Sequence, residues 1–346
     1  MASQQGGDER FPPLDFRRLR TYPLARGRRK VSASAFAGLH RPGDSFETFL
    51  TRLPAFLAVS DLRQVIDRLA LAARHRRTVI AGIGAHVIKV GLSPVLIDLM
   101  ERGVVSLVAM NGAGVVHDLE IALAGRTSEE VLEELETGRF CMARDTADHI
   151  HAALARAVPE GGGYGRAVGE HILAHRFPHR DLSILAQGVR LGVPVTVHVA
   201  VGTDIHHMHA GASGADLGEG SLRDFRTFCA AVATLEKGVY LNVGSAVILP
   251  EVFLKAVSVA RNLGRGLRDF TTVNLDFIRH YRTQMNVVTR PVARGGRGFN
   301  LIGPHEILLP VIAAGLIERL AKGGGAKGAA KRGGGGGARP RKKRKR

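Results

Sequence analysis

The sequence predicts an α/β fold built on a doubly wound, mostly parallel sheet with helices on both faces. At least five short β-branched segments alternate with helical segments along the chain. These segments are apolar on both faces, as strands buried in a parallel sheet are. Several of them run directly into turns that contain glycine, a usual connection from strand to helix in such a sheet.

The expected strands share a run of apolar residues bounded by turn residues. They cover residues 78–83, 104–110, 193–201, 239–243 and 270–275. Segment 286–292 is expected to be extended, and 294–298 to form a loop of glycine and arginine.

Helices are expected where apolar residues recur at helical spacing. They cover residues 46–57, 62–74, 143–157, 167–174, 182–191, 222–235, 251–262 and 304–320. Between the first two strands, Ser93 is suited to cap a compact helix, Pro94 fits its first position, and Gly103 ends it. A further helix is expected from about Val115. Thr127 and Glu130 form a capping-box pair that begins an acidic helix ending before Gly138.

Composition divides the chain of 346 residues into three parts: an irregular N-terminal arm (1–43), an α/β domain (44–321) and a basic tail (322–346). The net charge of +18 lies mainly outside the domain, because residues 31–321 hold 30 basic and 28 acidic residues. The tail holds 11 basic residues and no acid. It has no apolar residue larger than alanine, so we expect it to be disordered.

Charge and cysteine content limit the partners and the compartment. The tail is suited to non-specific, salt-sensitive contact with nucleic acid or another polyanion, although it could equally be an extension without a partner. Cys141 and Cys229 lack metal-type spacing and fit a reducing compartment. No apolar run is long enough to span a bilayer, and residues 1–29 do not read as a secretory signal. We therefore expect a cytoplasmic protein that makes no membrane contact.

Glycine turns after the first two strands predict a nucleotide site. The segment from Gly82 to Val87 carries the first two glycines of the dinucleotide-binding fingerprint, but Val87 stands in place of the third. After the second strand, Asn111-Gly112-Ala113-Gly114 offers backbone amides at the start of a helix, where anions bind. Plain strand–helix connections are the alternative interpretation.

Polar residues follow the expected strands, at the edge where ligands bind in a doubly wound sheet. They are His86, Asn111, Asp204, Ser245 and Asp276.

After the third of the expected strands, His206, His207 and His209 join His198 near this edge. Imidazoles suit acid–base catalysis or metal binding. We predict His206, His207 and His209 as catalytic residues and assign no metal ligand; loop packing is the alternative. Glu170, His171 and His175 are expected to lie on a solvated helix face.

A family resemblance begins at these residues. The segment GLSPVLIDLMERGVVSLVAMNGAGVVHDLEIALA resembles the cofactor region of deoxyhypusine synthases, which have a Rossmann-like NAD-binding fold. GVPVTVHVAVGTD, LNVGSAVILP and FTTVNLD are similar to later strand ends of that family, so the likeness covers roughly residues 45–320. It implies NAD as cofactor, a homotetramer and a polyamine or other small amine substrate.

The resemblance also implies which residues contact NAD. Ala85 and His86 stand where the family has a serine–asparagine pair. The implied cofactor-binding residues are Gly84, His86, Asn111, Gly112, Ala113, His117, Asp204, Gly244 and Ser245.

One departure from the family is chemical. Deoxyhypusine synthases carry the transferred group as an imine on a lysine in a tryptophan–glycine–lysine motif. Here no lysine lies between Arg261 and Ala321, and the chain has no tryptophan. Arginine stays protonated and cannot form that imine. We therefore expect an NAD-dependent enzyme acting on a small amine or hydroxyl substrate without the covalent step. The alternatives are a non-catalytic nucleotide-binding protein tethered by its tail and a metal-assisted hydrolase using the histidine cluster.

Overall fold

A six-stranded, all-parallel sheet forms the centre of the protein, which confirms the predicted fold class. The computed structural model describes residues 11–329, with side chains described as far as Lys322. The strand order is β3-β2-β1-β4-β5-β6, the order of a doubly wound sheet whose direction of winding reverses between β1 and β4. The strands are β1 (Val79–Ile83), β2 (Leu107–Asn111), β3 (Val195–His198), β4 (Val239–Val243), β5 (Thr271–Asp276) and β6 (Arg297–Ile302).

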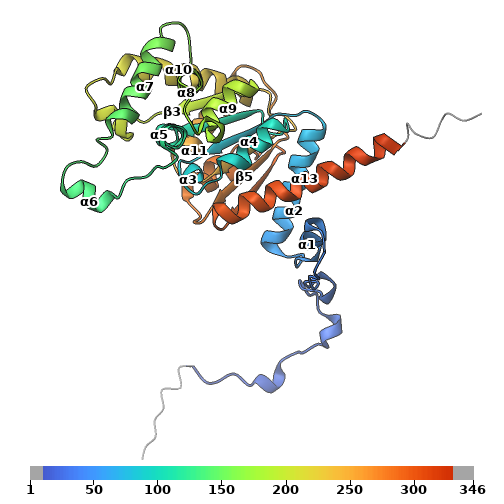
Figure 1. Cartoon of the computed structure of the whole chain (residues 1–346). Coiled ribbons are helices and arrows are strands. Elements are labelled where there is room, and N and C mark those ends of the chain that lie inside the picture. The colour runs from blue at the N-terminus through green and yellow to red at the C-terminus, as the bar shows by residue number, and fades with distance from the viewer. Residues whose placement is uncertain (1–10, 330–346) are drawn as a thin grey trace, which may run out of the picture.

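Helices connect these strands and flank the sheet (Figure 1). The α-helices are α1 (Phe46–Arg52), α2 (Leu57–Arg74), α3 (His86–Lys89), α4 (Ser93–Glu101), α5 (Gly112–Ala124), α6 (Val131–Glu136), α7 (Arg144–Ala157), α8 (Tyr164–Ala174), α9 (Ile184–Leu191), α10 (Gly214–Val232), α11 (Ile248–Asn262), α12 (Tyr281–Thr283) and α13 (His305–Ala329). Shorter 3-10 helices are η1 (Phe16–Arg18), η2 (Leu24–Arg26), η3 (Ala33–Ala35), η4 (Arg180–Leu182) and η5 (Ile205–Met208), and η6 (Gln284–Thr289) is a π-helix.

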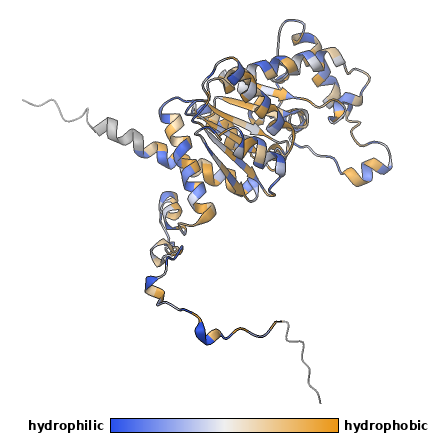
Figure 2. Ribbon diagram, turned by 180° about the vertical axis from the view of Figure 1, so that it is seen from behind, coloured by the Kyte–Doolittle hydropathy of each residue, from blue (hydrophilic) through white to orange (hydrophobic). Residues whose placement is uncertain are grey.

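Alternate residues of each strand feed two separate hydrophobic clusters, as the two-residue period of a strand requires. On β1, Val79 and Ala81 belong to the larger cluster, which includes residues of α2, α4, α9 and α13. Ile80 belongs to the smaller cluster with residues of α10 and α11. Figure 2 shows hydrophobic residues gathered on the strands between these layers. Burial on both faces explains why the strands read as continuous apolar runs.

Some expected element boundaries are wrong for local reasons. The helix expected over 46–57 ends at Arg52, because Pro54 disfavours helical backbone before it, and α2 then starts at Leu57. The cap of α4 is Leu92, and Ser93 is a buried first helical residue. Thr127 does not cap the acidic helix; α6 follows Glu130 without a side-chain cap.

The C-terminal third holds the largest difference from the sequence-based prediction. Segment 286–292, expected to be extended, lies mostly in η6, and strand β6 begins at Arg297, within the loop expected over 294–298. Among the described strands, β6 pairs only with β5. Its two end residues are exposed, and Phe299 and Leu301 between them are buried. An edge strand that starts Arg-Gly lacks the continuous apolar run by which the inner strands were recognised.

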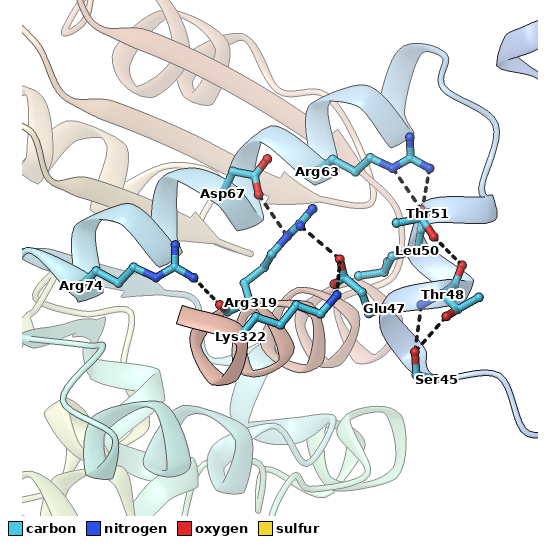
Figure 3. A network of polar contacts seen from close by, with 10 residues as sticks. All are labelled: Ser45, Glu47, Thr48, Leu50, Thr51, Arg63, Asp67, Arg74, Arg319 and Lys322. Atoms are coloured by element: carbon cyan, nitrogen blue, oxygen red, sulfur yellow. Dashed lines mark hydrogen bonds and ion pairs between the residues drawn. The ribbon is translucent and has the colours of Figure 1, made fainter. Parts of the chain in front are cut away.

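The first two and last α-helices pack together through charged side chains (Figure 3). Arg319 of α13 lies 3.1 Å from Glu47 of α1 and 3.2 Å from Asp67 of α2. Lys322 adds a second cation 3.3 Å from Glu47. Arg63 donates to the Leu50 carbonyl at 2.6 Å, which joins α2 to α1. These contacts attach the N-terminal helices to the helix that follows the last strand.

Both ends of the chain extend away from the sheet (Figure 1). Residues 11–43 contain only the turns η1, η2 and η3 and are largely exposed. Helix α13 continues to Ala329, beyond the expected end at Leu320. The rest of the basic tail lies outside the described residues, so its predicted disorder and its nucleic-acid contact remain predictions. Within residues 11–329, no helix has the length and apolarity needed to cross a membrane.

Candidate functional site

Two glycines meet where the winding of the sheet reverses. Gly84 follows β1 and Gly244 follows β4, and the Gly84 amide donates to the Val243 carbonyl at 2.8 Å. A Cβ on Gly84 would lie 2.1 Å from the Gly244 carbonyl oxygen, and Gly244 has a φ of +67°. Neither position accepts a side chain without strain. The two backbones therefore pack directly against each other at the edge where doubly wound sheets bind ligands.

Histidines from distant segments border these glycines. His305, the first residue of α13, is 1% exposed, and its Nε2–H donates to the Leu275 carbonyl at 3.2 Å. Its Nδ1 has no hydrogen-bond partner among the described residues. The exposed His86 lies with its ring centroid 5.7 Å from that of His305. Sequence reasoning missed His305 because it missed β6; a polar residue soon after that strand was the available signal.

Ser245 was predicted to bind cofactor, and its hydrogen bonds connect groups within the chain. Its hydroxyl accepts from the Leu249 amide at 3.2 Å and so caps the start of α11. Its carbonyl accepts from the Asn242 side chain at 2.9 Å. At the end of β5, Asp276 is 3% exposed and accepts from the Phe277 amide at 2.8 Å.

The start of α5 was expected to offer free amides to a ligand, and this expectation is wrong. Asn111 caps the helix by accepting from the Gly114 amide at 3.1 Å. The Asp204 carboxylate also lies at this end of the helix. A Cβ on Gly112 would lie 1.9 Å from Asp204 Oδ2, so the glycine makes room for that carboxylate. A phosphate could occupy this corner only after Asp204 had moved.

Asp204 and His207 form a buried pair beside α5. Asp204 is 3% exposed, and its Oδ2 lies 3.8 Å from His207 Nε2. His207 Nδ1 accepts from the Gly202 amide at 3.1 Å, so the ring proton is on Nε2, which faces Asp204. Burial raises the pKa of the Asp204 carboxyl to about 6, and burial lowers the pKa of His207. The carboxylate is thus a proton acceptor whose pKa lies close to neutral pH.

The other predicted catalytic histidines are engaged elsewhere. His206 is fully buried and its Nε2 lies 2.7 Å from the Tyr164 hydroxyl; burial lowers its pKa to about 3. His209 Nε2–H donates to the Cys141 carbonyl at 3.0 Å. His198 does not join them, because it packs against Phe228 of α10. Of the four imidazoles, only His207 faces the Asp204 carboxylate.

His117 lies in the second turn of α5 and was predicted to contact cofactor. Its Nδ1 donates to the Thr127 hydroxyl at 2.6 Å, and Thr127 in turn donates to Glu120. Burial, together with the positive charge of Lys89, lowers the pKa of His117 to about 4. Thr127, expected to cap α6, is therefore used to orient this histidine.

A second histidine group joins α7 to α8. His171, expected on a solvated face, is 7% exposed; its Nε2 lies 3.0 Å from His149 Nδ1, and its ring stacks on His175 at 3.9 Å. Within the described part of the chain, no group of three His, Cys, Asp or Glu side chains is arranged to hold a metal ion.

The class that the fold defines is a doubly wound α/β protein in which two glycines meet at the reversal of strand order. No family model and no curated protein matches the chain. Among solved structures, it is similar to a candidate deoxyhypusine synthase from Entamoeba histolytica (TM-score 0.49, 11% identity), covering 80% of this chain and 94% of that one.

Two further solved structures are similar to this chain. A candidate LOR/SDH protein from Methanococcus maripaludis S2 has a TM-score of 0.46 and 14% identity, with 81% of this chain and 72% of that chain covered. ArgZ, an arginine dihydrolase from Cyanobacteria, has a TM-score of 0.46 and 15% identity over 74% of this chain. This chain spans only 31% of the ArgZ chain. TM-scores below 0.5 at such identities decide nothing about cofactor, substrate or activity.

Proposed function

We propose that the protein binds NAD across the carboxyl ends of β1 and β4 and oxidises a small amine or alcohol. The observation that carries this proposal is the contact of Gly84 with Gly244 at the reversal of strand order. A dinucleotide needs close approach to backbone at this place, and side chains there would prevent it. Glycine at both positions fits that need.

The fit differs between the two predicted phosphate positions. At Gly84 and Gly244 the neighbouring side chain is that of His305, which carries no negative charge. At the start of α5, the Asp204 carboxylate lies against Gly112, and its charge would repel a phosphate. We therefore assign the pyrophosphate to the glycine pair and not to the start of α5. The exposed His86 and the buried His305 would border the bound nucleotide.

When bound, NAD would supply hydride acceptance, and the chain would handle the proton that leaves with the hydride. We assign that proton to Asp204. Its carboxyl has a raised pKa of about 6, which suits a general base at neutral pH. His207 would lie beside the carboxylate, with its Nε2 3.8 Å from Oδ2, whereas His206 and His209 would hold the loop through Tyr164 and Cys141. The resemblance to deoxyhypusine synthases suggests an amine substrate, and the missing lysine argues against a covalent imine.

Titration of the full-length protein with NADH, followed by nucleotide fluorescence, tests the binding step. We expect saturable binding that G84A weakens at least about tenfold, because the new methyl group would meet the Gly244 carbonyl. The matched control is G218A in α10, where an added Cβ meets nothing within 4 Å. G218A should bind as the wild type does. Absence of saturable binding by the wild-type protein would refute the proposed cofactor.

The variant D204N separates chemistry from binding. It should retain nucleotide affinity within about threefold while hydride transfer falls at least about a hundredfold, since general-base catalysis contributes about 10²–10⁴-fold. Equal rates for D204N and wild type would remove Asp204 from the proposed mechanism. Binding of NADH without turnover of any amine or alcohol would instead favour the non-catalytic nucleotide-binding protein.

A further inference from the structure

A cavity of about 470 Å³ lies beside the edge strand β3, away from the glycine pair described above. It is lined by the start of α8, the end of α9, residues 193–196 and one side of α10. None of the candidate nucleotide-binding or catalytic residues lines it. Its volume lies within the range of small-molecule sites, about 300–1,000 Å³.

Glycines at the start of α8 shape one wall of this cavity. A Cβ on Gly165 would lie 1.9 Å from the Val195 carbonyl oxygen of β3, and a Cβ on Gly163 would lie 2.0 Å from Asp224 Oδ1. The missing side chains allow α8 to begin directly against the strand and against Asp224 of α10. The carboxylate is thereby exposed to the cavity between two backbone segments.

Asp224 is the charged residue of this lining that has no charged partner in the described chain. Arg166 pairs with Glu170 at 2.6 Å, and Arg223 pairs with Glu219 at 2.7 Å. Asp224 is 4% exposed, and its Oδ2 accepts from the amides of Gly165 and Val197 at 2.9 and 2.8 Å. No described residue donates to its Oδ1, which lies against the Gly163 wall.

The remaining lining supplies apolar surface next to this carboxylate oxygen. Val189, Val193, Pro194 and Val195 all border the cavity. A charged acceptor inside a site with apolar walls selects a ligand that combines an N–H cation with a hydrocarbon group.

We propose that this cavity is a second ligand site, which binds a small primary ammonium compound with its nitrogen on Asp224 Oδ1 and its hydrocarbon part against the valine and proline wall. This site is independent of the nucleotide proposed at Gly84 and Gly244. A role of Asp224 restricted to joining α8 and β3 is the competing explanation, and it predicts no ligand.

Calorimetric titration of the full-length protein with hexylammonium tests the proposal, with 1-hexanol and hexanoate as neutral and anionic controls of similar shape. We expect saturable binding of hexylammonium, and affinities at least about tenfold weaker for both controls. Because NAD is not involved, the titration is performed without it and then repeated with NADH. A failure of the nucleotide proposal would leave this result unchanged.

Two variants test where the cation binds. D224N removes the charge, and T227W fills the cavity from the exposed end of its lining without touching the amides that Asp224 holds. Each should weaken hexylammonium binding at least about tenfold. T227W keeps the test decisive if D224N fails to fold. No saturable binding by the wild type, equal binding of hexanol, or undiminished binding by folded T227W would each overturn the proposal.

Discussion

Buried polar groups have different hydrogen-bond partners in the two halves of the sheet, one around β2 and β3 and the other formed by β4, β5 and β6. Around β2 and β3, buried carboxylates accept from the first amides of helices that start far away in sequence. Asp118 accepts from Ile184 and Leu185 at the start of α9, at 2.7 and 3.2 Å, and Asp224 accepts from Gly165 of α8.

The half formed by β4, β5 and β6 uses neutral amides instead. Asn242 donates to Asn274 at 2.8 Å, and Asn274 donates to Asn300 at 2.9 Å, so three residues in register form a ladder across the strands. Asn300 then donates to Gln284 of the π-helix η6 at 3.2 Å. In the first half, burial raises the pKa of the Asp118, Asp204 and Asp224 carboxyls, and the candidate proton acceptor Asp204 is one of them.

The largest effect is expected at a carboxylate. D118A removes the acceptor of two buried amides and of the Ser183 hydroxyl. Each buried donor left without a partner costs about 1–3 kcal/mol, so unfolding in urea should show a loss of about 3–5 kcal/mol. D118N, which keeps one side-chain acceptor, should lose less. A loss below about 1 kcal/mol for D118A would mean that the carboxylate does not support the half of the sheet in which it lies.

The amide ladder should tolerate change somewhat better. N274A removes the hydrogen bonds to Asn242 and Asn300, but Asn242 keeps its bond to the Ser245 carbonyl. We expect a loss of about 2–3 kcal/mol in the same urea experiment. Because amides do not titrate, this loss should be the same at pH 5 and pH 8. A strong pH dependence would contradict the proposed difference between the halves.

The pH dependence of stability in the half around β2 and β3 can be measured at His198. Burial lowers its pKa to about 3 in the folded protein, whereas the unfolded chain binds this proton below about 6.5. The unfolded state therefore gains protons first, and stability falls as pH decreases from 7 to 5, by about 2 kcal/mol for this one group. H198Q should lose that share of the acid sensitivity, measured as the change in unfolding free energy between the two pH values. Parallel pH profiles of the two proteins would show that His198 does not contribute.

The smallest effect is expected on the surface. Asp98 and Arg102 pair at 2.7 Å on α4, with both side chains more than two-fifths exposed. Exposed pairs contribute at most about 1 kcal/mol, so D98A should change the melting temperature by less than about 2 °C. A larger shift would show that charge in this half matters outside the buried carboxylates as well.

Strand positions could be predicted from the sequence wherever burial on both faces imposed a run of apolar residues. The prediction of 239–243 coincides with β4, that for β1 begins one residue early, and that for β5 lies one residue early at both ends. The glycines that end α4 and α9 also follow from local geometry, because Gly103 and Gly192 both have positive φ. Strand β6 was not predicted because an edge strand lacks a continuous run of apolar residues. The π-helix η6 was not predicted because residues such as Val287 and Val288 favour strands when judged locally.

Part of the candidate site could likewise be predicted from the sequence, and part could not. Gly84 and Gly244 could be named from the strand–glycine pattern, but their contact could not, because it joins segments 160 residues apart. His305 was missed with β6. The start of α5 was expected to face a ligand, but Asp204 lies against Gly112 there, and it belongs to a loop about 90 residues later in the chain.

By itself, the sequence determined the alternation of strands and helices, the glycine turns after the strands and the absence of the imine-forming lysine. These properties depend on residues within a few positions of one another, where side-chain periodicity and backbone freedom act. Tertiary structure alone decided the order of the strands and which of His206, His207 and His209 lies beside Asp204. It also decided which carboxylates accept from the first amides of helices. Those outcomes depend on which distant groups the folded chain brings within hydrogen-bonding distance, and no local pattern records that distance.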